Sequence, residues 1–220
     1  MRKTLSFIKL DFITIKPYLT LKNLIIFAVI MLCILITSGT IAAIVGLVAF
    51  LCVTYVSYPF AVGEQRGIDA LYITLAIPRK TVVRGRYLFA IATDLSAIAL
   101  SFVVTLLMSI VSQKPFAVTE TALVALIAFF MLSLTQTLQL PIYFKLGYTK
   151  AKVLAYAPFV LWTLIPLLFT GVISPDIGVT ILNWLKANTY LSIGLCLAAW
   201  CAAFLASYTL STRFYKAREF

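Results

Sequence analysis

Six apolar runs, each about as long as a bilayer is thick, constrain this chain more than any other feature. A transmembrane helix needs about 20 mostly apolar residues. The runs that qualify are residues 19–37, 41–62, 86–111, 121–144, 153–173 and 190–211. Only 11% of the 220 residues are charged, against about 25% in an ordinary soluble domain. We therefore predict an all-α membrane protein with six transmembrane helices in a single transmembrane domain, residues 1–220.

The first two runs are separated by only a few small or polar residues, so one long helix is the competing interpretation. A single helix from Leu24 to Val62 would extend about 58 Å, almost twice the hydrocarbon core of about 30 Å. We therefore expect two spans joined by a tight turn.

The basic residues are distributed unequally along the chain. Fourteen of the eighteen Lys and Arg lie before the first run, between the second and third, between the fourth and fifth, or after the sixth, and Lys22 and Arg86 lie at the adjoining ends of the first and third runs. Only Lys114 and Lys186 fall in the opposite set of connections. Because cytoplasmic loops carry the excess of Lys and Arg, both termini are predicted to be cytoplasmic. The net charge of +11 mostly reflects this asymmetry, and without a platform of stacking aromatic residues it does not indicate nucleic-acid binding.

Residues 1–18 are predicted to form an amphipathic helix on the membrane surface. The apolar stripe consists of Leu5, Ile8, Phe12 and Ile15, and the basic edge of Arg2, Lys9 and Lys16. This arrangement is typical of interfacial helices, whose long basic side chains reach toward lipid phosphate.

The longest cytoplasmic connection, residues 63–87, contains a short helical pattern within residues 63–80. Its apolar residues have helical spacing and are Ile68, Leu71, Tyr72 and Leu75. Glu64 and Asp69 suit the start of a helix, and Pro78 ends the pattern. Such a helix could lie on lipid, but residues 68–77 contain no Lys or Arg, which favours docking into a groove on a partner protein.

One ionisable residue lies well inside a predicted span. Asp94 is eight residues beyond Arg86, about 12 Å deep, and Gln136 and Gln139 of the fourth run reach similar depths. A proton relay or substrate contact is one interpretation. We favour a hydrogen bond that joins the two spans, since a single carboxylate makes a poor relay.

The chain lacks the motifs of common enzymes. It has no phosphate-binding GxxxxGK[ST], no GxSxG and no histidine, and its four cysteines all lie inside apolar runs. We therefore expect no catalytic residue, no metal site and no enzymatic activity in this chain.

Two short motifs border the third and fourth runs. The first comprises Glu64, Leu75, Pro78, Arg79, Lys80, Arg84, Gly85, Arg86 and Tyr87, and the second is LPIYFKLGY at residues 140–148. Together with the topology they resemble the six-span permeases of ABC-2 type exporters, in particular a short bacterial group. Two departures are the single acidic residue Glu64, where two are common, and Arg86 in place of the usual lysine.

The resemblance implies a permease subunit of the bacterial plasma membrane that exports amphipathic peptides or other hydrophobic cargo by alternating access. It implies a second permease subunit, identical or homologous, and two copies of a separate ABC ATPase, which bind ATP and magnesium; this chain itself would hold no cofactor. The loop helix would be the coupling helix. The residues expected to contact the ATPase are Glu64, Ile68, Asp69, Leu71, Tyr72, Leu75, Pro78 and Arg79.

Two other classes of function remain open from the sequence. One is the substrate-capture subunit of an uptake system, although the outer segments 112–120 and 174–188 contain few charged residues for binding a ligand. The other is an immunity or scaffold membrane protein that acts by binding alone.

Overall fold

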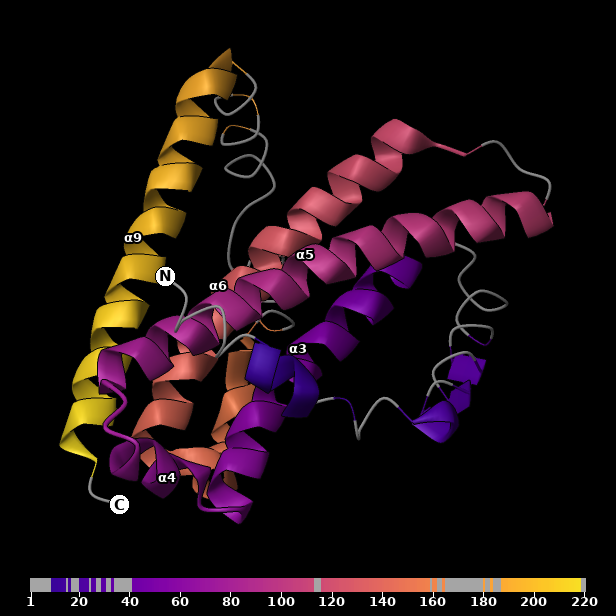
Figure 1. The fold of residues 1–220 in the computed structure, drawn as a ribbon. Coiled ribbons are helices and arrows are strands. Elements are labelled where there is room, and N and C mark those ends of the chain that lie inside the picture. Colours follow the sequence, from indigo (N-terminus) through magenta and orange to yellow (C-terminus); the bar gives the residue numbers. More distant parts are fainter. Residues whose placement is uncertain are drawn as a thin grey trace.

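The described part of the chain is entirely helical in its regular structure. The computed structural model describes residues 9–14, 16, 20–23, 25–26, 29–30, 33, 41–112, 116–158, 160–161, 164, 180, 183 and 187–218. Its labelled elements are α3 (Ile41–Gln65), α4 (Ile68–Thr74), α5 (Arg79–Ser112), α6 (Val118–Ala151), the 3-10 helix η2 (Leu154–Tyr156) and α9 (Thr189–Ala217) (Figure 1). The prediction of an all-α protein is confirmed.

Three helices of the described part are long and apolar enough to cross a membrane. They are Arg79–Val111, Val118–Ala151 and Tyr190–Ala217, which contain the predicted runs 86–111, 121–144 and 190–211. Helix α3 covers the run 41–62. The runs 19–37 and 153–173 lie only partly within the described residues, so the count of six spans stays a prediction.

The helices near α4 extend beyond the predicted spans. Helix α3 continues to Gln65, so the predicted connection 63–87 begins inside it, and α5 begins at Arg79 rather than near Arg86. Apolar runs measure the hydrocarbon thickness, whereas a helix continues until its backbone is interrupted. Pro78 directly precedes α5, where its missing N–H costs little, and its carbonyl accepts the N–H of Thr81 at 2.8 Å.

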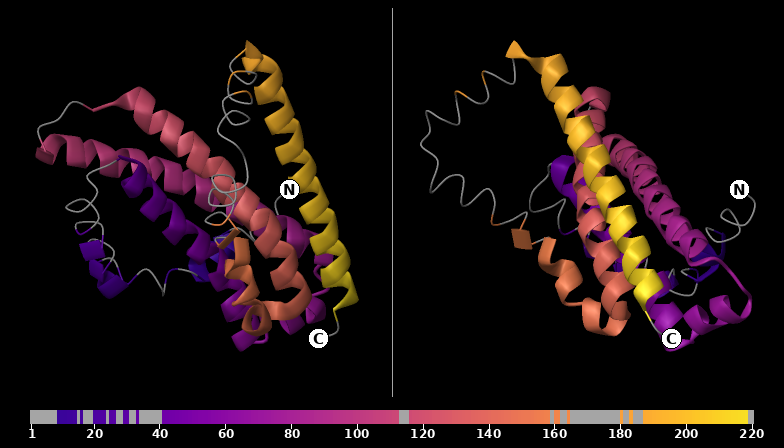
Figure 2. Two further views of the ribbon diagram at one scale, coloured as in Figure 1. Left: turned by 180° about the vertical axis from the view of Figure 1, so that it is seen from behind. Right: turned by 90° about the vertical axis from the view of Figure 1, so that its left-hand side faces the viewer.

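The long helices pack closely at the end that holds α4 and separate at the other. Helix α3 contacts α5 and α6, and α9 contacts both α6 and α5. Figure 1 and the left view of Figure 2 show the N-terminal half of α9 leaning away from α5 and α6. The main buried apolar cluster lies near α4 and comprises Val56, Tyr72, Val82, Val83, Tyr87, Ala90, Leu140, Phe144 and Tyr215.

Candidate functional site

Helix α4 is held between two turns that need unusual backbone angles. Gly67, with φ of 62°, turns the chain from α3 into α4. After α4, Ala76 has φ of 50°, and the N–H of Ile77 donates to the carbonyl of Tyr72 at 2.9 Å. These turns place seven helical residues across one end of the bundle, as Figure 1 shows.

The predicted apolar stripe is divided between the core and the surface. Tyr72 is 4% exposed within the main cluster, and Ile68 packs against that cluster. Burial raises the pKa of Tyr72 to about 12. Leu71 and Leu75, by contrast, are 52% and 61% exposed. These two leucines are the most exposed residues of the stripe.

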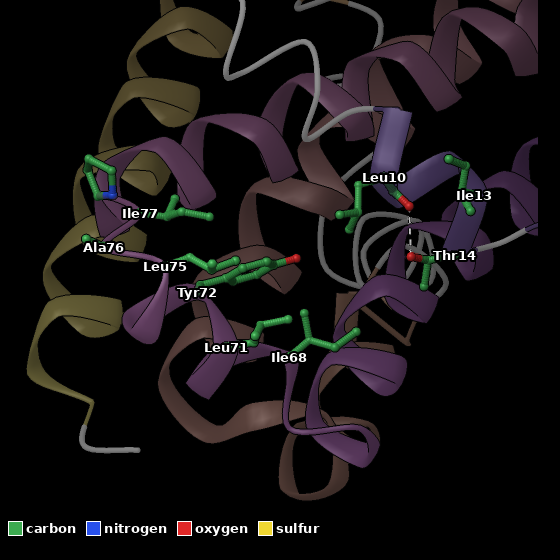
Figure 3. Close-up of a pocket in the computed structure, with 10 residues that line it drawn as sticks. Leu10, Ile13, Thr14, Ile68, Leu71, Tyr72, Leu75, Ala76 and Ile77 are labelled. Atoms are coloured by element: carbon green, nitrogen blue, oxygen red, sulfur yellow. Dashed lines mark hydrogen bonds between the residues drawn. The ribbon is translucent and has the colours of Figure 1, made fainter.

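An apolar groove of about 540 Å³ runs between α4 and the N-terminal segment (Figure 3). We call it the α4 groove; it is lined by Leu10, Ile13, Thr14, Ile68, Leu71, Tyr72, Leu75, Ala76, Ile77 and Pro78. The helical residues 9–14 form one wall. Phe12 of this segment packs edge-on against Phe89 of α5, with ring centroids 5.1 Å apart. The described part of the predicted surface helix therefore packs against the bundle.

A buried ion pair fixes that wall. Asp11 Oδ1 lies 2.8 Å from Arg86 Nη1, and their side chains are 1% and 5% exposed. Arg86 also donates to the carbonyl of Pro59 at 3.1 Å, and its guanidinium lies 4.8 Å from the ring centroid of Phe60. Burial raises the pKa of Asp11, and the positive charge of Arg86 opposes that rise.

Sequence reasoning missed Asp11. The prediction of a basic surface helix gave no role to a carboxylate in it, and the motif that contains Arg86 did not indicate a partner. One signal was available, because Asp11 is the only acidic residue before Glu64. An acidic residue in an otherwise basic and apolar segment needs a nearby cation if it is buried.

Glu64 joins the two sequence motifs. Its carboxylate accepts the backbone N–H groups of Tyr148 and of Thr149, the latter at 3.1 Å. These amides follow Gly147, where α6 is kinked at φ 77° and ψ 173°. Burial raises the pKa of Glu64, but these hydrogen bonds and the charge of Arg218 outweigh burial and lower it overall. Glu64, which was expected to face an ATPase, is thus bound within the chain.

The C-terminal end of α9 is attached to both ends of the α4 connection. The hydroxyl of Tyr215 donates to Asp69 Oδ1 at 3.0 Å. Arg79 Nη1 donates to the carbonyls of Tyr215, Lys216 and Arg218 at 3.0, 2.5 and 3.0 Å. Asp69 and Arg79, also expected to contact the ATPase, therefore hold α4 and α5 to α9.

These contacts bring parts of all four basic segments to one end of the molecule. The ion pair places residues 9–14 there, Glu64 places the end of α6, and Arg79 places the end of α9. The distribution of Lys and Arg had predicted that these segments share one side of the membrane.

Of the two glutamines at the depth of Asp94, only Gln136 forms a hydrogen bond with it. Gln136 Nε2 donates to Asp94 Oδ1 at 2.6 Å, and Asp94 is fully buried. Gln139 Nε2 donates instead to the carbonyl of Ala155 at 2.7 Å. Within the described residues no three His, Cys, Asp or Glu side chains gather as metal ligands would.

The described helices define a class of protein: a helical membrane protein, with three helices long and apolar enough to cross a bilayer. The chain belongs to a known family of this class, because residues 6–216 match the model of the ABC-2 family transporter proteins. No curated protein and no solved structure gives a significant match. Members of the family are transport subunits that work with an ABC ATPase and are generally not catalytic themselves.

Proposed function

We propose that this chain is the permease subunit of an ATP-driven exporter of amphipathic peptides or other hydrophobic cargo. It would pair with a second permease subunit and with two copies of an ABC ATPase that bind ATP and magnesium. The end that holds α4 would lie in the cytoplasm of a bacterial cell, as would both termini. The excess of Lys and Arg in the segments that meet there supports this orientation.

The observation that carries the proposal is the exposure of Leu71 and Leu75 beside the α4 groove. Both lie on a connection between membrane helices that has its own helix and little basic charge. A few apolar residues beside a groove can supply most of the free energy of a protein contact. A side chain of the ATPase inserted between α4 and residues 9–14 would cover both leucines.

The contacts around α4 supply a way to transmit movement. Asp69 connects α4 to α9, and Tyr72 anchors it in the buried cluster beside α5 and α6. Displacement of α4 by the ATPase would move the attached helix ends together as a rigid body. The spans would then switch between inward-open and outward-open states, biased by the partner.

The helix surfaces support a hydrophobic or amphipathic cargo. Helices α5, α6 and α9 expose many large apolar side chains, among them Leu95, Leu107, Leu126 and Leu195. A path lined by such side chains suits cargo with an apolar face.

ATP-dependent uptake of a labelled amphipathic peptide into inside-out vesicles would test export. Uptake only into right-side-out vesicles would reverse the proposed direction.

The coupling contact is tested by replacing both exposed leucines, Leu71→Ser with Leu75→Ser. The variant should insert into the membrane normally but no longer co-purify with the ABC ATPase that the wild type retains, because the apolar contact is lost. Tyr72 is left intact, since replacing it would disturb the core.

A matched control is the double variant Val153→Ser with Leu154→Ser, which changes two other exposed apolar residues outside the groove. It should keep the ATPase bound and its hydrolysis unchanged. Retention of the ATPase and of normal hydrolysis by the variant at positions 71 and 75 would contradict the assignment of α4 as the coupling helix.

A further inference from the structure

A second groove lies between α5 and α9, and no residue of α4 lines it. Its volume is about 230 Å³, and we call it the α5–α9 groove. It is lined by Arg84, Tyr87, Leu88, Ile91, Phe204, Leu205 and Tyr208. Apart from Arg84 and the tyrosine hydroxyls, this lining is apolar. Both helices are long and apolar enough to cross a membrane. We therefore expect the groove to open toward lipid.

The floor of this groove is fixed in position. The hydroxyl of Tyr87 hydrogen-bonds with Ser207 Oγ at 2.6 Å and Ser211 Oγ at 2.8 Å. The ring of Tyr87 makes edge-on contacts with Phe204 and Tyr208, with centroids 5.3 and 5.5 Å apart. A ligand that enters the groove therefore meets an ordered aromatic surface, which lowers the entropic cost of binding.

The end of the groove nearest α4 is positively charged. Arg84 lines it, and Lys80, four residues earlier, lies on the same face of α5. Both side chains are exposed. Across the described ranges, no carboxylate forms an ion pair with either residue. The groove thus combines an apolar channel along the membrane helices with two available cations where those helices leave the hydrocarbon.

We propose that the α5–α9 groove binds an anionic phospholipid. Arg84 and Lys80 would hold the phosphate, and a segment of one acyl chain would lie along Leu88, Ile91 and Leu205. Basic sites between membrane helices recognise anionic headgroups in this way, because long basic side chains reach from the helix to the phosphate level. A phospholipid with net negative charge gains more from the two cations than phosphatidylcholine, whose choline group offsets its phosphate.

Charge distinguishes a lipid from other occupants of this groove. A cationic amphipathic peptide would meet two positive charges at the rim, which disfavours it. A second copy of the chain that presented the same face would place the same cations against each other. The lipid assignment does not rest on the direction or cargo of transport.

The test is native mass spectrometry of the full-length protein, purified with an equal mixture of phosphatidylglycerol and phosphatidylcholine of the same chain length. The wild type should retain phosphatidylglycerol in preference. Removing both cations, Lys80→Ala with Arg84→Ala, should reduce its retention about tenfold or more, because charge-assisted hydrogen bonds to the phosphate are lost.

The matched control removes two exposed lysines at the end of α6, Lys150→Ala with Lys152→Ala, and so gives the same net charge. This control should bind phosphatidylglycerol like the wild type. Leu205→Trp should fill part of the groove and weaken retention of the lipid with its headgroup contacts intact. Leu205 is exposed, so the fold tolerates this change, and an unchanged melting temperature would verify it.

Three outcomes would overturn the proposal. The first is equal retention of the two lipids by the wild type. The second is unchanged retention in either the variant without the cations or the Leu205→Trp variant. The third is displacement of phosphatidylglycerol by millimolar inorganic phosphate, which would assign the rim to a soluble anion instead.

Discussion

The end of the molecule that holds α4 and the opposite end are built from the same long helices but are joined differently. At the α4 end, an ion pair, the carboxylate of Glu64 and the guanidinium of Arg79 connect segments that are far apart in the sequence. At the opposite end, α9 separates from α5 and α6 (Figures 1 and 2). Apolar residues there are widely exposed, among them Ile110, Val111, Tyr190 and Ile193.

The difference follows from the physics of helices in lipid. Lipid tails are as apolar as leucine, so the hydrophobic effect does not drive membrane helices together, and close packing and hydrogen bonds must do so. The α4 end has such polar contacts, whereas the tips of α5, α6 and α9 present mainly apolar side chains. The α4 end is therefore a fixed platform, whereas the described residues at the other end leave large apolar side chains exposed. Such an asymmetry would suit the coupling proposed above.

The largest loss of stability is expected when the ion pair of the platform is broken. Arg86→Ala leaves the carboxylate of Asp11 buried without its cation, which costs about 3 to 5 kcal/mol. Thermal unfolding of the detergent-purified protein, followed by tryptophan fluorescence, should show a markedly lower melting temperature.

Replacing both charges provides the control for this prediction. The double variant Asp11→Leu with Arg86→Met should recover most of the lost stability, because neither charge is then buried alone. If Arg86→Ala melted like the wild type, the α4 end would not be the rigid region of the molecule, and the comparison of the two ends would fail.

Sequence reasoning could find the elements of this platform but not their partners. Apolar runs locate α5, α6 and α9 because hydrocarbon thickness fixes span length. Periodicity also identifies the stripe on α4, yet it does not say whether Tyr72 or Leu71 faces the bundle, since both have helical spacing. The role of Glu64 depends on backbone N–H donors of α6, and that of Arg79 on backbone carbonyl acceptors at the end of α9. Backbone donors and acceptors leave no trace in residue type.

A contact within the membrane was easier to anticipate. Asp94 and Gln136 lie at matching depths on consecutive spans, and polar groups within the bilayer need hydrogen-bond partners inside the protein. Membrane depth did not relate Asp11 to Arg86 in this way, because residues 1–18 were expected to lie on the membrane surface. Depth in a membrane is therefore predictable from chain position, whereas contacts between segments outside the hydrocarbon require the fold.

A smaller but specific effect is expected at the kink of α6. A Cβ atom at Gly147 would lie 2.7 Å from Arg218 Nη2 and 2.8 Å from Glu64 Oε2, and φ there is 77°. Gly147→Ala should therefore cost about 1 to 3 kcal/mol through backbone strain and displacement of Glu64. Denaturation of the purified protein measures this loss.

Two other glycines distinguish the cost of backbone strain from the cost of displacing Glu64. Gly67 also has positive φ, but a Cβ atom there meets nothing within 4 Å, so Gly67→Ala should show the backbone cost alone. Gly194 lies in α9 toward the opposite end, with open space around it, and Gly194→Ala should leave stability unchanged or slightly improved. Equal losses at all three glycines would remove the contrast between the two ends.

The smallest effect is expected between the two ends, at Asp94. Asp94→Asn keeps the oxygen that accepts the hydrogen bond from Gln136 Nε2, so stability should change by no more than about 1 kcal/mol and most transport should remain. Asp94→Leu should cost more, because it leaves the buried amide of Gln136 without this acceptor.

Melting temperature and vesicle transport, measured together, distinguish a hydrogen bond that joins α5 to α6 from a charge used in transport. Complete loss of transport in a normally assembled Asp94→Asn variant would show that the carboxylate ionises during the cycle. The functional region would then extend from the α4 platform into the membrane.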